Sequence, residues 1–238
     1  MSELEGRIAV VTGASSGIGR ATAELFAKRG ARVAIFARTM EKLSAIAARY
    51  EDRMIAVAGD VADLADVERL FSVTEKSFGH CDLLVNNVGM IEPGRLVDTT
   101  LESWDRVIAV NLRSAFLASR RALPSMIEQR RGAIVNVASI SGVPGPRKYP
   151  GFTSYNASKG ALIAFTEALA VEVAEHDVRV NCVSPGSVDT PMWSETSGGA
   201  PANMTPDEIA ETILFLASDR SRPMNGQNLH VYSATDVG

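Results

Sequence analysis

The chain has 238 residues, of which 46% are hydrophobic and 22% are charged, and this composition fits one globular α/β domain over residues 1–238. The net charge of -4 gives no electrostatic reason to expect nucleic acid or an anionic membrane as a partner. No apolar run is long enough to cross a bilayer, and the first strand-like run begins too close to Met1 for a signal peptide, so we expect a cytoplasmic protein.

Strand-like runs and helical patterns alternate along the rest of the chain. In chain order we predict strand 7–12, helix 18–29, strand 32–37, helix 40–49, strand 54–59, helix 64–78, strand 82–86, helix 102–129 with a possible break, strand 133–138, helix 155–175, strand 178–183, helix 206–217 and strand 227–232. Near-continuous apolar strands in such an alternation predict a doubly wound, Rossmann-like parallel sheet with helices on both faces. Two segments read as loops, 142–154 and 190–205.

A glycine-rich turn follows the first predicted strand. Its residues are Gly13-Ala14-Ser15-Ser16-Gly17-Ile18-Gly19, and a helical pattern begins within it. The spacing Gly-x-x-x-Gly-x-Gly differs from the Gly-x-Gly-x-x-Gly of the commonest dinucleotide fingerprint. Glycines still allow a pyrophosphate to approach the backbone, and a helix start presents free N–H groups to it. We therefore favour nucleotide binding over a purely structural turn.

Small or polar residues lie just beyond several predicted strands. Gly13, Asp60, Asn87, Ser139 and Pro185 each hold this position. Because ligands of doubly wound sheets bind beyond the carboxyl ends of the strands, these residues could line one crevice.

Tyr155 and Lys159 are four positions apart and would share one face of a helix. Their unperturbed pKa values are about 10 and 10.4, so neither is a useful base alone near neutrality. An ammonium about 5 Å from the phenolate, at an effective dielectric of about 20, would favour ionisation by about 3 kcal/mol, or about two pKa units. The pair is interpreted as a tuned proton donor and acceptor; the alternative is a surface tyrosine beside a solvated lysine.

With these motifs in order, the chain resembles the short-chain dehydrogenase/reductase family over essentially its whole length. The matching residues are Thr12-Gly13-Ala14-Ser15-Ser16-Gly17-Ile18-Gly19, Asp60-Val61, Asn86-Asn87-Val88-Gly89, Asn111, Ser139, Tyr155-x-x-x-Lys159 and Pro185-Gly186-x-x-x-Thr190. The resemblance implies NAD(P)-dependent oxidation of an alcohol or reduction of a ketone, with a small-molecule substrate and a homotetramer or homodimer.

The same resemblance implies four catalytic residues: Asn111, Ser139, Tyr155 and Lys159. Tyr155 would donate the proton as general acid, and Lys159 would lower the phenol's pKa and bind the nicotinamide ribose. Ser139 would donate a hydrogen bond to the substrate oxygen, and Asn111 would hold a water near the lysine. Capping of a helix or turn is the alternative role for Ser139 and Asn111.

Two alternatives arise around this set. Tyr149 is rejected as a rival proton donor because no lysine follows it by four residues. Ser139 and Tyr155 are 16 residues apart, three more than the family usually shows, so the loop 142–154 must bulge outward for the chemistry to survive. Ser141 could replace Ser139, although Ser139 fits the end of the strand better.

Cofactor binding is expected from Gly13, Ser15, Ser16, Gly17, Ile18, Gly19, Arg38, Asp60, Val61, Asn87, Gly89, Tyr155, Lys159, Pro185, Gly186, Val188 and Thr190. The second strand ends at Ala37 without the carboxylate that binds the adenosine ribose in NAD enzymes. Arg38 follows, and a guanidinium can bind a 2′-phosphate. We predict NADP as the preferred cofactor, with NAD possible.

The sequence leaves the substrate open. Met192, Trp193 and Met204, in the expected lid at 190–205, could cover an apolar substrate or equally pack between lid and core. Arg147 and Lys148 could attract an anionic substrate, but solvated loop charge is the favoured interpretation.

Two other functions stay open beside this one. The first is reduction of acyl-carrier-protein thioesters, with Arg130 and Arg131 facing an acidic carrier; Val171, where such enzymes often have a second arginine, weakens it. The second is a non-catalytic cofactor-binding regulatory or scaffold protein.

Two segments depart from the usual family pattern, and the cysteines and histidines show no sign of a catalytic role. Val88 replaces a usual alanine and could displace the strand or the nicotinamide, and the end, His230-Val231-Tyr232-Ser233-Ala234-Thr235-Asp236, puts the tetramer in doubt. Cys81 and Cys182 are expected to be reduced, mostly buried thiols. The histidines have no ligand-like spacing, so we expect no catalytic metal.

Overall fold

The computed structural model describes residues 2–145 and 148–233, and seven parallel strands form one sheet through the described part. The strands are β1 (Ile8–Thr12), β2 (Arg32–Ala37), β3 (Met54–Ala58), β4 (Leu83–Asn86), β5 (Gly132–Val137), β6 (Val178–Pro185) and β7 (Asn228–Val231). They lie in the order β3-β2-β1-β4-β5-β6-β7, and each neighbouring pair is parallel. The predicted doubly wound sheet is confirmed, and its strand order reverses between β1 and β4.

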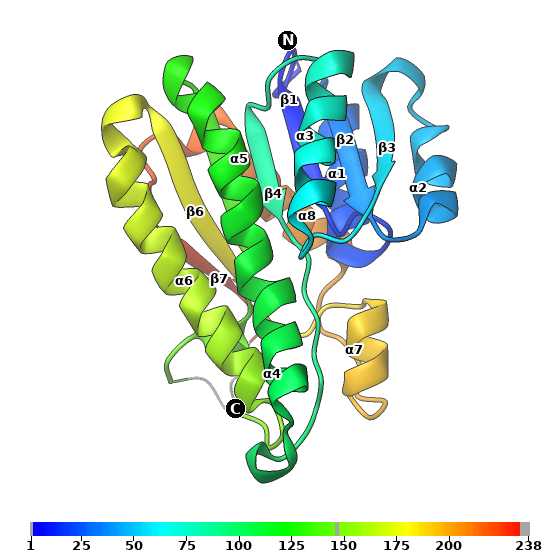
Figure 1. Cartoon of the computed structure of the whole chain (residues 1–238), viewed down its shortest axis with the longest axis vertical. Coiled ribbons are helices and arrows are strands. Elements are labelled where there is room, and N and C mark those ends of the chain that lie inside the picture. The colour runs from blue at the N-terminus through cyan, green and yellow to red at the C-terminus, as the bar shows by residue number, and fades with distance from the viewer. Residues whose placement is uncertain (1, 146–147, 234–238) are drawn as a thin grey trace.

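Helices cover both faces of the sheet (Figure 1). One face carries α1 (Gly17–Lys28), α2 (Met40–Ala47) and α8 (Pro206–Ala217), and the other carries α3 (Leu64–Ser77), α5 (Ser114–Glu128) and α6 (Thr153–Val173). Successive residues of β1 point to opposite sides, so Val11 packs with the first group and Val10 with the second. Burial on both faces explains why apolar residues fill consecutive strand positions rather than every second one.

The predicted break in helix 102–129 is a change of helical pitch. α4 (Leu101–Ile108) passes into a π-helical turn over Ala109–Arg113, and α5 follows directly. The extra residue in this turn brings Asn111 to a fully buried position.

The lid contains one element that the sequence analysis treated as loop, the short helix α7 (Pro191–Thr196). The Thr190 side chain accepts a hydrogen bond from the backbone N–H of Trp193, and Pro191 occupies the first turn. A threonine cap followed by proline is a helix-start signal that the sequence offered. α7 lies beyond the carboxyl ends of the strands, at the lower end of the molecule in Figure 1.

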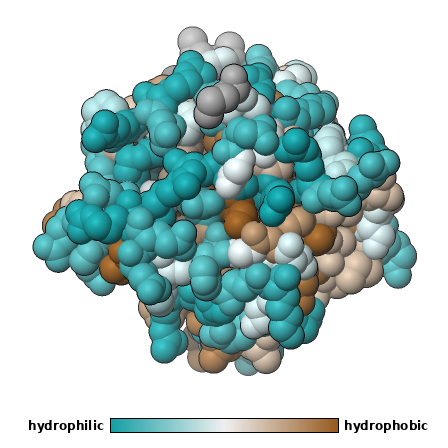
Figure 2. Space-filling model, turned by 90° about the horizontal axis from the view of Figure 1, so that it is seen from above, coloured by the Kyte–Doolittle hydropathy of each residue, from teal (hydrophilic) through white to brown (hydrophobic). Residues whose placement is uncertain are grey.

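The amino ends of the strands form the opposite end of the molecule, near the N-terminus. Figure 2 looks onto this end and shows a surface that is mostly hydrophilic, with small hydrophobic areas. Within the described ranges, no helix is long and apolar enough to span a membrane.

Candidate active site

One crevice of about 680 Å³ runs along the carboxyl ends of the strands, a volume within the usual range for ligand sites. Of the residues predicted for the site, all but Gly19 and Asn111 line this crevice: Gly13, Ser15, Ser16, Gly17, Ile18, Arg38, Asp60, Val61, Asn87, Gly89, Ser139, Tyr155, Lys159, Pro185, Gly186, Val188 and Thr190. The topology thus brings together residues from six strand ends. Gly19 and Asn111 contact these residues from outside the lining.

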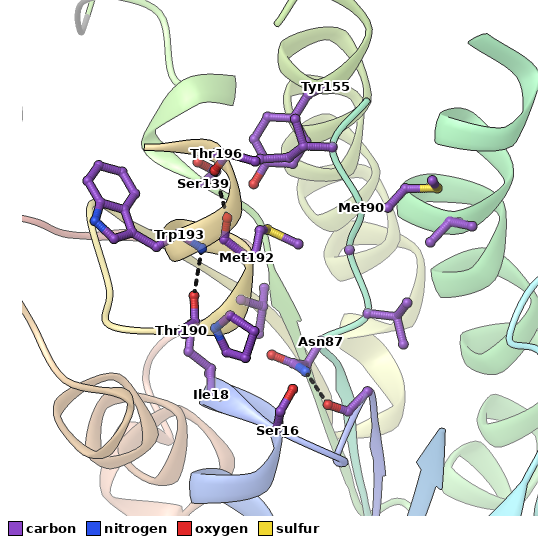
Figure 3. A pocket seen from close by; sticks show the side chains of 18 of the residues that line it. Ser16, Ile18, Asn87, Met90, Ser139, Tyr155, Thr190, Met192, Trp193 and Thr196 are labelled. Atoms are coloured by element: carbon purple, nitrogen blue, oxygen red, sulfur yellow. Dashed lines mark hydrogen bonds between the residues drawn. The ribbon is translucent and has the colours of Figure 1, made fainter. Parts of the chain in front are cut away.

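The glycine turn has the close packing that a pyrophosphate site requires. Gly13 has a φ of +68°, and a Cβ on Gly19 would lie 2.3 Å from Asn87 Nδ2 and 2.4 Å from Gly13 O. Asn87 Nδ2 donates to Thr12 O and Gly13 O, which fixes the turn against the end of β4 (Figure 3). The free N–H groups at the start of α1 then face the crevice, so these residues fit the diphosphate of a dinucleotide.

The crevice ends beside β2 in a positively charged region. Arg38 follows Ala37 and is exposed, and Lys42, one helical turn further along α2, lines the same part of the crevice. Sequence reasoning missed Lys42, because Arg38 precedes the helix and their spacing in the sequence does not place them together. This end of the crevice is therefore lined by two exposed cations.

Tyr155 and Ser139 lie close together in the crevice wall (Figure 3), near enough for the serine hydroxyl to act on the phenol. Ser139 Oγ accepts a hydrogen bond from Ser141 N at 3.1 Å, which leaves its hydroxyl hydrogen available for the phenol. The three extra residues of the loop therefore leave the serine–tyrosine contact intact, and the contact involves Ser139 rather than Ser141.

The pKa of Tyr155 is raised, opposite to the direction expected from its spacing with Lys159. Burial of the phenol is the larger cause, and the hydrogen bond with Ser139 opposes it. The Lys159 ammonium lies 5.9 Å from the centre of the tyrosine ring and donates to Val137 O at 2.8 Å. The lysine is thus aimed at the strand end, so burial decides the direction.

Lys159 is buried to 3% exposure between α6 and the sheet. Burial lowers the pKa of its ammonium to about 8, and the nearby Cys182 thiol opposes this shift. Burial also raises the pKa of Cys182 to about 12, so this thiol is protonated. A Cβ on Gly89 would lie 3.2 Å from Lys159 Nζ, so Gly89 packs closely against the lysine ammonium.

The Asn111 side chain fastens two parts of the site together. Its Oδ1 accepts from Met90 N at 2.8 Å, and its Nδ2 donates to Met90 O at 3.0 Å and to Ser158 Oγ at 2.9 Å. Ser158 Oγ donates to Tyr155 O. These bonds of the Asn111 amide hold the segment after β4 against α6.

The lid residues separate into three roles. The Met192 side chain points into the crevice between Tyr155 and Asn87 (Figure 3), whereas the Trp193 indole points away and donates to Ala200 O at 2.8 Å. Met204 packs against the core on the α1 and α8 face. The two roles considered for the lid, covering a substrate and packing on the core, therefore belong to different residues. Met192 lies over the crevice, and Met204 packs on the core.

Lys148 is exposed, as expected of a loop charge, but its ammonium is bonded within the chain. Its ammonium donates to the backbone oxygens of Ile140, Ser141 and Val143, at distances from 2.5 to 3.4 Å. It clamps the start of the loop, while Arg147 lies outside the described residues.

The Val88 side chain has room because the residue beside it, Gly13, has no side chain. Its Cγ2 lies 3.1 Å from the position of a Cβ on Gly13, and Val88 packs against the core on the α3 and α5 face. Within the described ranges, no group of three or more His, Cys, Asp and Glu side chains could hold a metal ion, and the absence of a catalytic metal stays a prediction.

The comparisons with known proteins agree with this geometry. The family model described as short chain dehydrogenase matches residues 7–200. The 3-oxoacyl-[acyl-carrier-protein] reductase FabG of Thermotoga maritima is 39% identical over 94% of this chain and 95% of its own length. The (2S)-[(R)-hydroxy(phenyl)methyl]succinyl-CoA dehydrogenase subunit BbsD of Thauera aromatica is 38% identical over 96% of each chain.

Among solved structures, the 3-ketoacyl-(acyl-carrier-protein) reductase of Brucella melitensis complexed with NADH matches with a TM-score of 0.91 and 33% identity, over 98% of this chain and 100% of that one. The fold and crevice define a nicotinamide-dependent oxidoreductase that acts on CH–OH and C=O groups. The chain belongs to the short-chain dehydrogenase family.

Proposed function

We propose that the protein interconverts a ketone and a secondary alcohol, with Tyr155 as proton donor and acceptor and with NADPH favoured over NADH. The observation that carries the proposal is the buried Tyr155 phenol, which lies in the crevice wall together with Ser139 and the Lys159 ammonium. The 3-oxoacyl and hydroxy(phenyl)methyl groups in the relatives' names support this kind of reacting carbon.

A bound nicotinamide would supply hydride to the carbonyl carbon, or take it from the alcohol carbon. Tyr155 would then give its phenolic proton to the carbonyl oxygen, and its raised pKa keeps that proton in place at neutral pH. The Ser139 hydroxyl would hold the same oxygen by a hydrogen bond, and Lys159 would keep a positive charge next to the phenol as the proton leaves. Asn111 would act by holding Met90 and Ser158 in place.

The proposed NADPH preference depends on Arg38 and Lys42, the two exposed cations at the adenosine end of the crevice. A charge-assisted hydrogen bond to the phosphate contributes about 1.5–3 kcal/mol. Arg38→Ala should therefore lower the NADPH/NADH ratio of kcat/KM by about ten- to a hundredfold. Arg49→Ala is the matched control, because Arg49 is bonded to Glu24 and lies outside the crevice. An unchanged ratio in Arg38→Ala would show that this assignment is wrong.

The experiment for the reaction itself follows the absorbance of NADPH, and then of NADH, with a panel of ketones and alcohols. We expect turnover in the wild type and a loss of at least about a hundredfold in Tyr155→Phe, since general acid catalysis contributes that much. Cofactor binding without any turnover would instead support the regulatory or scaffold function.

Reduction of acyl-carrier-protein thioesters is the second candidate, supported by the named reductases among the relatives. The arginines expected to meet a carrier are engaged elsewhere: Arg130 binds Asp177 and Glu175 O, and Arg131 faces Asp82. Val171 is 80% exposed where a second arginine was sought. These contacts favour a small free substrate over a carrier-bound one.

A homotetramer or homodimer in the cytoplasm completes the proposal. Phe116 on α5 and Val171 on α6 expose apolar side chains on the outer side of their helices, which supports association. The C-terminal residues Ala234 to Asp236, which raised doubt about the tetramer, lie outside the described part of the chain. Light scattering after gel filtration would measure the assembly.

A further inference from the structure

A row of aromatic rings lines the substrate side of the crevice. The ring centres of Tyr149 and Phe152 are 6.3 Å apart with planes at 54°, and those of Phe152 and Tyr155 are 6.4 Å apart at 74°. Such separations and tilts are typical of favourable aromatic pairs. All three residues line the crevice, and Tyr149 is 48% exposed, so the row runs from the rim to the proton donor.

The wall across from this row is also apolar. Met192 points into the crevice from α7 (Figure 3), and its Cε lies 3.7 Å from the position of a Cβ on Gly89. A thioether makes favourable contacts with aromatic rings and adapts to their shape. A flat apolar group bonded to the reacting carbonyl would therefore contact rings on one side and sulfur on the other.

The polar groups around this space are bonded within the chain. Lys148 holds three backbone oxygens, and Arg106 makes two hydrogen bonds to Glu92. Thr196 Oγ1 donates to Met192 O. Glu195, exposed at the rim, adds a negative charge. The described cations near this space are already bonded within the chain, so an anionic substituent would give up its hydration without gaining a new ion pair. An apolar ring gives up no hydrogen bonds to water when it enters the same space.

We propose that the substrate is an aryl ketone or the matching aryl secondary alcohol, with its ring along Tyr149 and Phe152. This proposal rests on the proposed ketone–alcohol function and adds the class of substituent. Phe152 and Tyr149 then determine specificity, while Ser139 and Tyr155 serve the carbonyl oxygen.

The test compares acetophenone with cyclohexyl methyl ketone, which has a similar volume but no aromatic ring. kcat/KM is measured for both ketones with NADPH in the wild type, Phe152→Leu and Tyr149→Leu. Because the intrinsic reactivities of the two ketones cancel between enzymes, the quantity of interest is the change in their ratio. An aromatic pair contributes about 0.5–1.5 kcal/mol, so Phe152→Leu should lower the acetophenone preference about three- to tenfold. Tyr149→Leu should lower it in the same direction.

Phe78→Leu is the matched control, because the Phe78 ring lies outside the crevice, at the end of α3 where it faces Arg32, and it should leave the ratio unchanged. Phe152 directly precedes α6, so NADPH fluorescence titration of each variant checks that the site is intact. An unchanged ratio in both crevice variants, or a wild type that prefers acetoacetate, would overturn the aryl proposal alone. A wild type that binds NADPH and reduces no ketone would overturn the proposed function together with it.

Discussion

At the scale of single residues, Lys159 carries a positive charge at a site with 3% exposure, and its pKa is lowered from 10.5 to about 8. That shift corresponds to roughly 3 kcal/mol of unfavourable burial while the ammonium is charged in both states. Between about pH 8 and 10.5 the unfolded chain binds the proton and the folded chain has lost it, so stability rises with pH in that window.

Replacement of Lys159 tests whether the buried lysine makes stability rise with pH. Relative to the wild type, Lys159→Met should lose about 2–3 kcal/mol of unfolding free energy between pH 7 and pH 10, because only the wild type gains stability there. Urea denaturation at the two pH values measures this change. Lys42→Met, which removes an exposed lysine, is the control and should follow the wild type at both. If the unfolding free energies of Lys159→Met and Lys42→Met changed equally between the two pH values, the lowered pKa of Lys159 would be contradicted.

The raised pKa of Tyr155 gives the two reaction directions different pH profiles. The phenol is protonated at neutral pH, so kcat/KM for ketone reduction should be nearly flat below about pH 8 and fall above it, as Lys159 loses its proton. kcat/KM for alcohol oxidation should rise with pH across the neutral range, since it needs the scarce phenolate. Initial rates in both directions measure the two profiles, and an oxidation rate independent of pH would count against Tyr155 as the base.

Residue identities in the site were predictable because each motif has a chemical reason for its composition. Glycines admit a phosphate, and a tyrosine four residues before a lysine places both on one side of α6. The pKa direction of Tyr155 was not predictable, because spacing carries no information about burial. The bonds of Lys148 and of the Asn111 amide also depend on backbone groups that only the folded chain brings near.

At the scale of elements, the first βα unit depends on Gly19, which has no room for a side chain. Gly19→Ala would place a methyl group 2.3 Å from Asn87 Nδ2 and 2.4 Å from Gly13 O, and one of these contacts is with backbone. The turn must therefore shift, and we expect NADPH affinity to fall at least about tenfold, with a loss of stability of about 1–3 kcal/mol typical of overpacking. Isothermal titration with NADPH and thermal unfolding measure the two effects.

Gly94→Ala is the matched control for this change. A Cβ on Gly94 would meet only Thr99 Oγ1 at 3.7 Å, an ordinary contact. Cofactor affinity should then remain that of the wild type. Equal losses in the two variants would show that the effect is a general cost of replacing glycine.

Long periodic elements were predicted nearly to their ends, because apolar strands between amphipathic helices leave few alternatives. Two elements depended on subtler signals. The π-helical turn at Ala109–Arg113 is stabilised by tertiary bonds from Asn111 to Met90, which no local pattern reveals. α7 has only six residues, too few for periodicity, and its Thr190–Pro191 start was its one local signal.

At the scale of the whole molecule, a chain of buried polar side chains runs along one face of the sheet, between β4, β5, α5 and α6. Asn86 on β4 donates to Asn136 Oδ1 at 2.8 Å, and Asn136 Nδ2 donates to Thr166 on α6 at 2.9 Å. Asn86 also donates to Ser119 on α5. These bonds join two central strands to two helices. Both asparagines are visible in the sequence as polar residues within apolar runs, but their partners on α5 and α6 lie about 30 residues away, so no local pattern predicts the bonds.

Removal of the Asn136 amide, which links Asn86 to Thr166, should destabilise the whole fold. Asn136→Val leaves buried donors and acceptors without a partner, which costs about 2–3 kcal/mol. For a chain of this length, that loss corresponds to a fall of roughly 5–10 °C in Tm, measured by calorimetry. Ser44→Ala, on the exposed side of α2, is the control and should change Tm little. A Tm equal to that of the wild type would show that the network contributes nothing net.

The loop between Ser139 and Tyr155 is anchored at both of its ends. At its start, a Cβ on Gly142 would lie 2.5 Å from the backbone carbon of Lys159, so this turn sits directly on α6. At its end, Gly151 O accepts a hydrogen bond from Gly94 N. Apart from Lys148, whose ammonium holds the start of the loop, the chain between these anchors can change in composition during evolution without moving the proton donor. Directed evolution of residues 143–150 that keeps Lys148 is therefore a route to new substrates that starts from intact catalysis.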